Sequence, residues 1–254
     1  MKFNIITIFP EIFESYFGES IIKRAQEKGL IKIKIHNLRD FTDDRHKTVD
    51  GRPYSGGPGM IFKTEPIYKA VSFIKRTLQP FNRVRGRQAQ GKGKTSLRLV
   101  GRGPKSKVIL FSAKGKKFNQ AMAKKLSKFN ELTFICGRYE GVDERIAKHV
   151  ADFELSVGDY VLTGGEIPAM TLVDAISRLI PGVIKEESLK KESFSLSKTK
   201  KGSILSEAEL EYPQYTRPEI FSPKKGVSWR VPKVLLSGNH KKIEEWQKKH
   251  SKKR

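Results

Sequence analysis

The chain has 254 residues, of which 37% are apolar, and this content excludes a chain that is disordered throughout. Lysine and arginine number 51 against 27 acidic residues, which gives a formal net charge of +24. A charge so far from neutral indicates a polyanionic partner. Nucleic acid is the leading candidate, and an acidic membrane surface is the alternative.

The sequence also argues against several kinds of site. The single cysteine, Cys136, excludes an intrachain disulfide and a multi-cysteine zinc site, and the five histidines are not spaced as metal ligands. No G-x-G-x-x-G turn follows the first apolar run, and no G-x-x-x-x-G-K-[ST] occurs. Without a transmembrane-length apolar run or a signal-peptide pattern, we expect a cytoplasmic protein with no membrane partner.

The N-terminal part begins with a short apolar run at 2–9 that Pro10 closes, which predicts a strand. Residues 11–28 carry apolar side chains at helical spacing up to Gly29, which predicts a helix that ends there. The run at 31–36 alternates with period two, as in a strand with one wet face near a sheet edge.

The middle of the chain alternates between apolar runs and amphipathic segments. The runs at 107–112 and 131–137 are continuously apolar, as in strands that are buried on both faces. Helices are predicted at 116–129, 141–150 and 166–180, and a further strand is predicted at 152–157. The helix at 166–180 is opened by Pro168 and stopped by Pro181. This alternation predicts an α/β fold with a mostly parallel sheet.

Two regions break the alternation. Residues 81–107 hold nine basic residues, no acidic one and several glycines, which indicates a basic insertion between a helix and a strand. The stretch 183–205 is polar and predicts an interdomain linker. A basic helix capped by Asn239 then indicates a small helical C-terminal domain at 206–254 that binds RNA, which leaves 1–182 as the α/β domain.

Three turns rich in small residues follow predicted strands, at 111–115, 136–141 and 156–166. In an open α/β sheet, ligands bind beyond the carboxyl ends of the strands, where glycine allows the backbone to approach a ligand closely. Each turn alone is typical of a plain strand-to-helix connection. Together the three indicate a ligand site at one end of the sheet.

Six blocks occur in order: "DRHKTVDGRPYSGGPGM", "CGRYEGVDER", "SVGDYVLTGGEIPAM", "ISRLIPGV", "YTRPE" and "VLLSGNH". Together they resemble the bacterial tRNA (guanine-N1)-methyltransferase family, which methylates the guanosine just 3′ of the anticodon, at position 37. The resemblance implies the knotted SPOUT class, with a deep trefoil knot, a homodimer and S-adenosylmethionine bound in a bent form. It also implies magnesium, which no feature of the sequence itself requires.

The resemblance further implies a cofactor pocket made largely of backbone groups, because a methyl donor carries its own leaving group and needs chiefly alignment. We expect the pocket to comprise Leu110, Phe111, Ser112, Ala113, Gly137, Glu140, Val157, Gly158, Asp159, Tyr160, Val161, Leu162, Gly164, Gly165 and Pro168. Ala113 stands where the family usually has proline. No metal ligands are predicted from the residues.

Guanine N1 carries a proton at neutral pH, so its methylation needs a base and a group that stabilises the charge on O6. By resemblance, Glu192 matches the family's linker aspartate and Arg178 the arginine that meets O6. Glutamate is a departure from the family pattern, since it reaches one methylene further than aspartate. Glu186 and Glu187 are the nearest alternative bases.

Two other functions remain open. Glu192 in place of aspartate favours a non-catalytic RNA-binding or ribosome-assembly protein on the same fold. A related rRNA methyltransferase would share the cofactor pocket, but the linker and the "YTRPE" region match the tRNA enzymes. The C-terminal domain ends soon after "SGNHKKIEEWQKKH", earlier than in the family, so phosphate contacts from the insertion at 81–107 are a hypothesis, with a solvated loop as its alternative.

Overall fold

The computed structural model describes residues 1–77, 105–190, 192–194 and 210–251. The chain forms two compact units, Met1–Ile184 and Lys185–Arg254, and each is considered by itself. Residues 81–104 of the predicted insertion at 81–107 lie outside the described residues. Residues 191 and 195–205 of the predicted linker at 183–205 lie outside them too.

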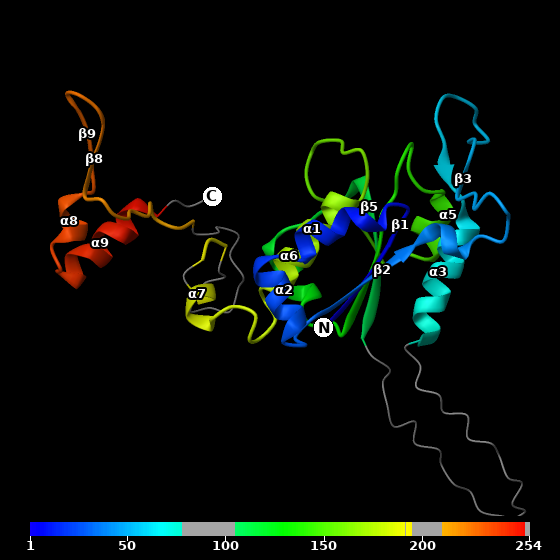
Figure 1. Ribbon diagram of the computed structural model, residues 1–254, viewed down its shortest axis with the longest axis horizontal. Helices are drawn as coiled ribbons and strands as arrows, with labels where there is room; N and C mark the ends of the chain where they lie inside the picture. Colours follow the sequence, from blue (N-terminus) through cyan, green and yellow to red (C-terminus); the bar gives the residue numbers. More distant parts are fainter. Residues whose placement is uncertain (78–104, 191, 195–209, 252–254) are drawn as a thin grey trace, which may run out of the picture. The chain divides into compact units, whose positions relative to one another are not determined.

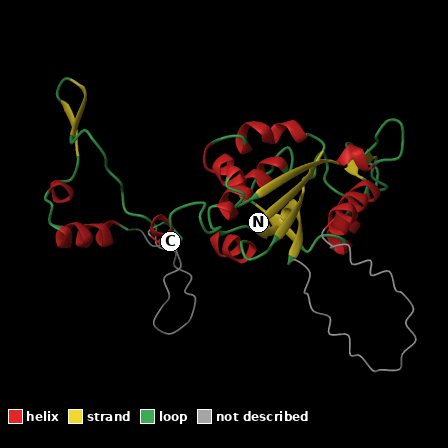
Figure 2. Cartoon of the chain, turned by 60° about the horizontal axis from the view of Figure 1, so that its bottom comes forward, coloured by secondary structure: helices red, strands yellow, loops and turns green. Residues whose placement is uncertain are grey.

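The first unit is built around one sheet of five parallel strands in the order β2-β1-β6-β5-β7 (Figures 1 and 2). The strands span β1 (Lys2–Thr7), β2 (Lys32–Asn37), β5 (Ser106–Lys117), β6 (Glu131–Ile135) and β7 (Phe153–Ser156). The predicted α/β fold with a mostly parallel sheet is confirmed. β6 is buried along its whole length and β2 is an edge strand, as their apolar patterns predict.

Helices cover both faces of the sheet (Figure 1). The helices α1 (Glu14–Phe17), α2 (Ser20–Glu27), α4 (Gln120–Leu126) and α6 (Glu166–Ser177) contribute buried side chains to one core cluster, and α3 (Thr64–Thr77) and α5 (Glu144–His149) contribute to the other. Within β1, Phe3 and Ile5 belong to the first cluster and Ile6 to the second. The two cores therefore fix the sheet between the two helix layers.

The single helix predicted at 11–28 is wrong. The segment forms a 3-10 turn at Pro10–Phe13 followed by α1 and α2, with a break at Gly18 and Glu19. The break arises because Glu19 is extended, with φ of −127° and ψ of 160°, and Ser20 takes a left-handed φ of 50°. The predicted stop at Gly29 is confirmed, since its φ of 68° suits glycine.

The helix α6 begins at Glu166, as predicted, and Pro168 lies in its first turn. Gly165 precedes the first turn, and its carbonyl accepts a hydrogen bond from Ala169 N at 3.0 Å. A proline is tolerated here because first-turn N–H groups have no partner within the helix. The end at Ser177 comes before Pro181, as expected.

The small-residue stretch at 111–115 is not a strand-to-helix turn, because β5 continues to Lys117. Phe111 and Lys116 both pair with Leu155 of β7, so residues 112–115 leave the ladder between them. A Cβ on Gly115 would lie 2.6 Å from Leu155 N, which explains why glycine stands where the strand returns. The departure from the ladder carries these residues toward the carboxyl end of the sheet.

A short hairpin-like pair, β3 (Asp50–Gly51) and β4 (Ile61–Phe62), frames the glycine-rich loop between them. Phe62 N donates to Gly141 O at 3.0 Å and Asp143 N donates to Phe62 O at 3.1 Å. Glu140 N donates to Met60 O, also at 3.0 Å. These bonds hold the loop against the segment that follows β6.

A buried polar cluster lies where β1, β2 and β6 adjoin. The carboxylate of Glu131 pairs with Lys2 Nζ at 3.1 Å and accepts a hydrogen bond from the side chain of Asn4. Asn4 Oδ1 also lies 3.1 Å from His36 Nε2. Burial, together with the charges of Lys34 and Lys2, lowers the pKa of His36 to about 4.

This cluster predicts a pH dependence of stability. The unfolded chain protonates His36 near pH 6.5 and the folded chain only near pH 4, so its stabilising contribution is present above pH 6.5 and is lost as the pH falls toward 4. The urea midpoint of His36→Gln should therefore fall less between pH 7 and pH 5 than that of the wild type. An equal fall in both proteins would contradict this assignment.

The second unit contains α7 (Glu186–Lys190), the antiparallel hairpin of β8 (Ile220–Lys224) and β9 (Val227–Arg230), and the helices α8 (Lys233–Leu236) and α9 (His240–His250). The prediction that Asn239 caps the last helix is confirmed, because its side chain accepts from Lys242 N at 3.1 Å. The hairpin was not expected from the sequence.

Candidate functional site

A pocket of about 510 Å³ opens at the carboxyl ends of β5, β6 and β7. All the residues that the sequence assigns to the cofactor line it except Gly158 and Asp159. Gly158 instead bonds to the Ser156 side chain, and Asp159 pairs with Lys117. The lining includes Leu110, Phe111, Ser112, Ala113, Gly137, Glu140, Val157, Tyr160, Val161, Leu162, Gly164, Gly165 and Pro168.

The floor of the pocket is a close crossing of two backbone segments. Gly165 N donates to Gly137 O at 2.9 Å, and Arg138 bridges to Gly164 in an antiparallel manner. A Cβ on Gly165 would lie 2.6 Å from Cys136 Cα and 3.1 Å from Gly137 N. The crossing therefore requires glycine at 165, and Gly137, Gly164 and Gly165, which have only main-chain heavy atoms, line the pocket.

The turn after β7 forms one wall. Ser156 Oγ donates to Gly158 O at 2.9 Å, and Tyr160 Oη donates to Val157 O at 3.3 Å. In the same turn, Tyr160 is 56% exposed and Val161 is 88% exposed. This wall presents backbone groups, the apolar side chains of Val157, Val161 and Leu162, and hydroxyls that are held in the hydrogen bonds just described. Such a surface suits a flat, largely apolar group such as a purine.

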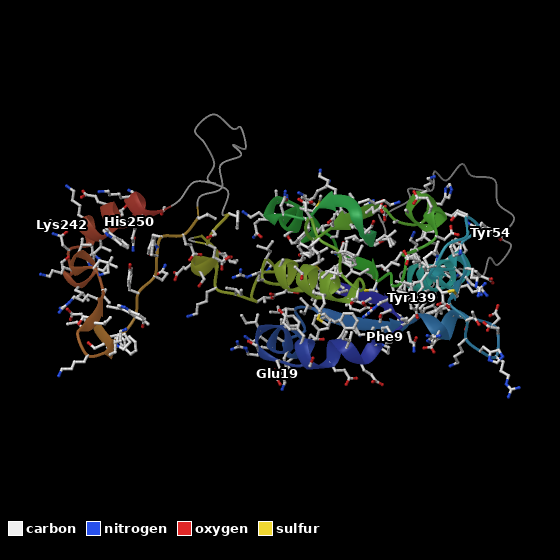
Figure 3. All side chains as sticks on the ribbon, turned by 90° about the horizontal axis from the view of Figure 1, so that it is seen from above. Phe9, Glu19, Tyr54, Tyr139, Lys242 and His250 are labelled. Carbon is white, nitrogen blue, oxygen red and sulfur yellow. The ribbon has the colours of Figure 1, made fainter. Side chains whose placement is uncertain are left out.

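The sequence analysis missed an ion pair between Arg138 and Glu166. Arg138 lines the pocket, and its Nε donates to Glu166 Oε2 at 2.9 Å. Glu166 is only 1% exposed, and its Oε1 accepts from Thr7 Oγ1 at 2.8 Å. The guanidinium carbon of Arg138 lies 4.8 Å from the centre of the Phe9 ring. Phe9 and Tyr139, the residue that follows Arg138, are labelled in Figure 3. "CGRYEG" and "GGE" contain both charged residues, but their spacing gives no sign of the pairing.

Another charged group, Lys114, lies in the part of β5 that leaves the ladder, at residues 112–115. Lys114 Nζ lies 2.6 Å from Glu144 Oε2 and 3.9 Å from Glu154 Oε1, and all three residues line the pocket. The hydrogen bond from Lys114 lowers the pKa of Glu144, and the same bond raises the pKa of Lys114. The lysine charge is thus already matched by carboxylates.

Cys136 lies at the crossing and is buried. Burial raises the pKa of its thiol well above the usual value, and the charge of Glu166 raises it further while that of Arg138 opposes the shift. Nucleophilic cysteines need a lowered pKa. Cys136 is therefore a packing residue and not a nucleophile.

The two residues assigned to catalysis lie in different units. Arg178 follows the last residue of α6 in the first unit, and its N–H donates to Asp174 O at 3.3 Å. Glu192 lies in the second unit, in the short described stretch 192–194. Neither lines the pocket. Their pairing remains a prediction.

No group of three or more His, Cys, Asp or Glu side chains in the described ranges is placed to hold a metal ion. None of the described helices is both long enough and apolar enough to cross a membrane.

The whole chain matches known proteins. The family model for tRNA (Guanine-1)-methyltransferase, TrmD, matches residues 1–254. A tRNA (guanine-N(1)-)-methyltransferase of Dictyoglomus turgidum is 47% identical over 252 residues, which cover 99% of this chain and 85% of that protein. Those of Clostridioides difficile and Carboxydothermus hydrogenoformans are each 46% identical over 99% of this chain, and the match covers 92% and 83% of them. The chain therefore belongs to the tRNA (guanine-1)-methyltransferase family.

Proposed function

We propose that this chain is an enzyme that transfers the methyl group of S-adenosylmethionine to N1 of the guanosine at position 37 of tRNA. The observation that carries the proposal is the glycine crossing at 164–165 against 136–138, which lines the pocket with main-chain groups. The net charge of +24 fits a polyanionic substrate.

The pocket fits the methyl donor in size and chemistry. Its volume of about 510 Å³ lies within the usual range of small-molecule sites. The wall at 156–162 suits the adenine, and the charged residues Arg138 and Glu140 suit the amino-acid part. When bound, the donor supplies an activated methyl group on a sulfonium that leaves as a neutral thioether.

The protein then has two chemical tasks in this proposal. The carboxylate of Glu192 accepts the proton from guanine N1, and the guanidinium of Arg178 donates hydrogen bonds to O6 as negative charge develops there. The pocket residues align the donor, and alignment of two reactants can supply a large part of the rate enhancement. Glu186 and Glu187 are the alternative bases.

We also propose that the enzyme works as a homodimer. Pro168 lines the pocket at the start of α6, whereas Arg178 follows its end. At 1.5 Å per residue, the 12 residues of α6 put Arg178 roughly 18 Å from the start of the helix, beyond the reach of its side chain. An Arg178 that meets the substrate must then come from a second copy of the chain.

An exposed apolar surface supports this dimer. Phe9, Ile12, Tyr16 and Ile167 are each 37–53% exposed, and the Pro10–Phe13 turn packs on α6. Single exposed apolar residues are ordinary, but a group of them typically marks an interaction surface. A monomeric sedimentation coefficient at micromolar concentration would contradict the dimer.

Further features belong to the same proposal. They are the trefoil knot in the first unit, S-adenosylmethionine bound in a bent form, magnesium as a participant, RNA binding by a small C-terminal domain at 206–254, and a cytoplasmic location. The family resemblance supports each of them. A knot is so rare among folds that topology alone would not suggest it.

The test is methyl transfer from labelled donor to a tRNA transcript with G at position 37. The expected product is 1-methylguanosine at that position, and a transcript with A37 should remain unlabelled. Labelling of rRNA in place of tRNA would favour the related rRNA methyltransferase. Binding of tRNA without any transfer, together with activity in Glu192→Asp, would favour the non-catalytic RNA-binding protein.

A further inference from the structure

The charged groups of the pocket differ in how they are paired. Lys114 and Arg138 are the basic residues among the described lining, and Lys114 is held by Glu144 at 2.6 Å. Arg138 is bonded through Nε alone, and no described residue accepts a hydrogen bond from its terminal nitrogens. A guanidinium bound in this way keeps its two terminal NH2 groups available for a second carboxylate.

Glu166, the partner of Arg138, is held by Thr7, and neither Glu166 nor Thr7 lines the pocket. The 1% exposed carboxylate of Glu166 receives Thr7 Oγ1 on one oxygen and Arg138 Nε on the other. Thr7 ends β1, and its Oγ1 also accepts from Phe9 N at 3.0 Å. Both oxygens of the buried charge are thus satisfied, and the direction of Arg138 is tied to the central sheet.

An independent observation points to the same ion pair. A Cβ on Gly164 would lie 2.5 Å from Glu166 Oε2, and it would lie still closer to Arg138 Nε. The backbone of Arg138 bridges to that of Gly164. The absence of a side chain at Gly164 therefore leaves room for the ion pair between Arg138 and Glu166. The close backbone contact at Gly164 and this ion pair thus depend on each other.

We infer that Glu166 is a positioning residue: through Nε it holds Arg138 so that the terminal nitrogens bind the carboxylate of the ligand's amino-acid part. The inference rests on the proposed function, which names the ligand. Glu140, two residues from Arg138, adds an opposite charge to the same pocket, so the site matches a zwitterionic amino-acid group.

Without the charge of Glu166, Arg138 is free to turn toward the carboxylates of the pocket, and it no longer presents its terminal nitrogens to the ligand. Glu166→Gln should weaken binding of S-adenosylmethionine and S-adenosylhomocysteine about 10- to 100-fold, the size expected for a hydrogen bond between charged groups. Arg138→Met should cause a similar loss. In the double variant, the loss should be no larger than in the worse single variant.

The comparison ligand is 5′-methylthioadenosine, which lacks the carboxylate and, like S-adenosylhomocysteine, is a neutral thioether. Its affinity, measured by titration calorimetry, should change less than about 2-fold in either variant, since the lost contact is absent from it. Equal losses for 5′-methylthioadenosine and S-adenosylhomocysteine would overturn the inference, and so would additive losses in the double variant.

The chain offers a matched control for a structural effect. Glu131 is also a buried carboxylate of this sheet that pairs with a cation, Lys2, and accepts from a neutral side chain, Asn4, yet it does not line the pocket. Glu131→Gln should lower the melting temperature as Glu166→Gln does and leave S-adenosylhomocysteine affinity unchanged. An equal loss of affinity in Glu131→Gln would reduce the role of Glu166 to stability.

Failure of this inference is distinguishable from failure of the proposed function. A wild-type protein that binds neither S-adenosylmethionine nor S-adenosylhomocysteine would remove the proposed function itself. Normal wild-type binding with an unchanged affinity in Glu166→Gln would remove only the positioning role.

Discussion

Gly165→Ala is expected to abolish detectable binding of the methyl donor and to destabilise the first unit. The added Cβ would lie 2.6 Å from Cys136 Cα, which is main chain and cannot move aside as a flexible side chain can. Overpacking in a tight site typically costs about 1–3 kcal/mol, and here it also separates the two segments that form the pocket floor. We expect at least about a 100-fold loss of affinity, or about 2.7 kcal/mol.

The measurement is titration calorimetry with S-adenosylhomocysteine, together with the urea midpoint of each variant. Gly51→Ala is the matched control, because a Cβ there would lie 3.5 Å from Lys63 Cε, an ordinary contact with a flexible side chain. It should keep wild-type affinity. Wild-type affinity in Gly165→Ala as well would show that the crossing is not the binding floor.

Glu192→Gln should lower kcat by about 100- to 10,000-fold, the range in which a general base contributes to proton transfer. The amide cannot accept the N1 proton, whereas the residues that line the donor pocket are unchanged. The Kd for S-adenosylmethionine should therefore stay at the wild-type value. Single-turnover methyl transfer under saturating tRNA separates this chemical step from product release.

Two companion variants sharpen this test. Glu187→Gln removes a carboxylate from α7 and should leave kcat within about 2-fold of the wild type if Glu192 is the base. Glu192→Asp keeps the carboxylate and should retain activity, since the resemblance implies an aspartate at the matching position of the family. A large loss in Glu187→Gln with none in Glu192→Gln would transfer the role of base to Glu187.

The pattern of apolar residues predicts much of the fold. The continuous apolar run at 131–137 contains β6, which is buried on both faces, and the alternating run at 31–36 largely coincides with the edge strand β2. Local chemistry also predicts the stop at Gly29 and the cap at Asn239. These succeed because burial and capping depend on side chains only a few residues apart.

The same pattern fails where the deciding contacts are distant. The strand β5 continues past residue 112 because Lys116 and Lys117 return to pair with β7, about 40 residues later in the chain. The helix predicted at 11–28 is broken by the conformations of Glu19 and Ser20, although the helical spacing of apolar residues continues across the break. Periodicity reports which face of a segment is buried and says nothing of its partner.

The sequence by itself determined the family and named most residues of the pocket, because six blocks keep both their composition and their order. Only the tertiary structure decided that Arg138, Glu166 and Thr7 form one charged unit. Thr7 and Glu166 are 159 residues apart, and they meet because parallel pairing brings the end of β1 beside the segment that leads into α6. A hydrogen bond between such distant side chains leaves no periodic trace in the sequence, since its geometry is set by the order of the strands and not by neighbouring residues.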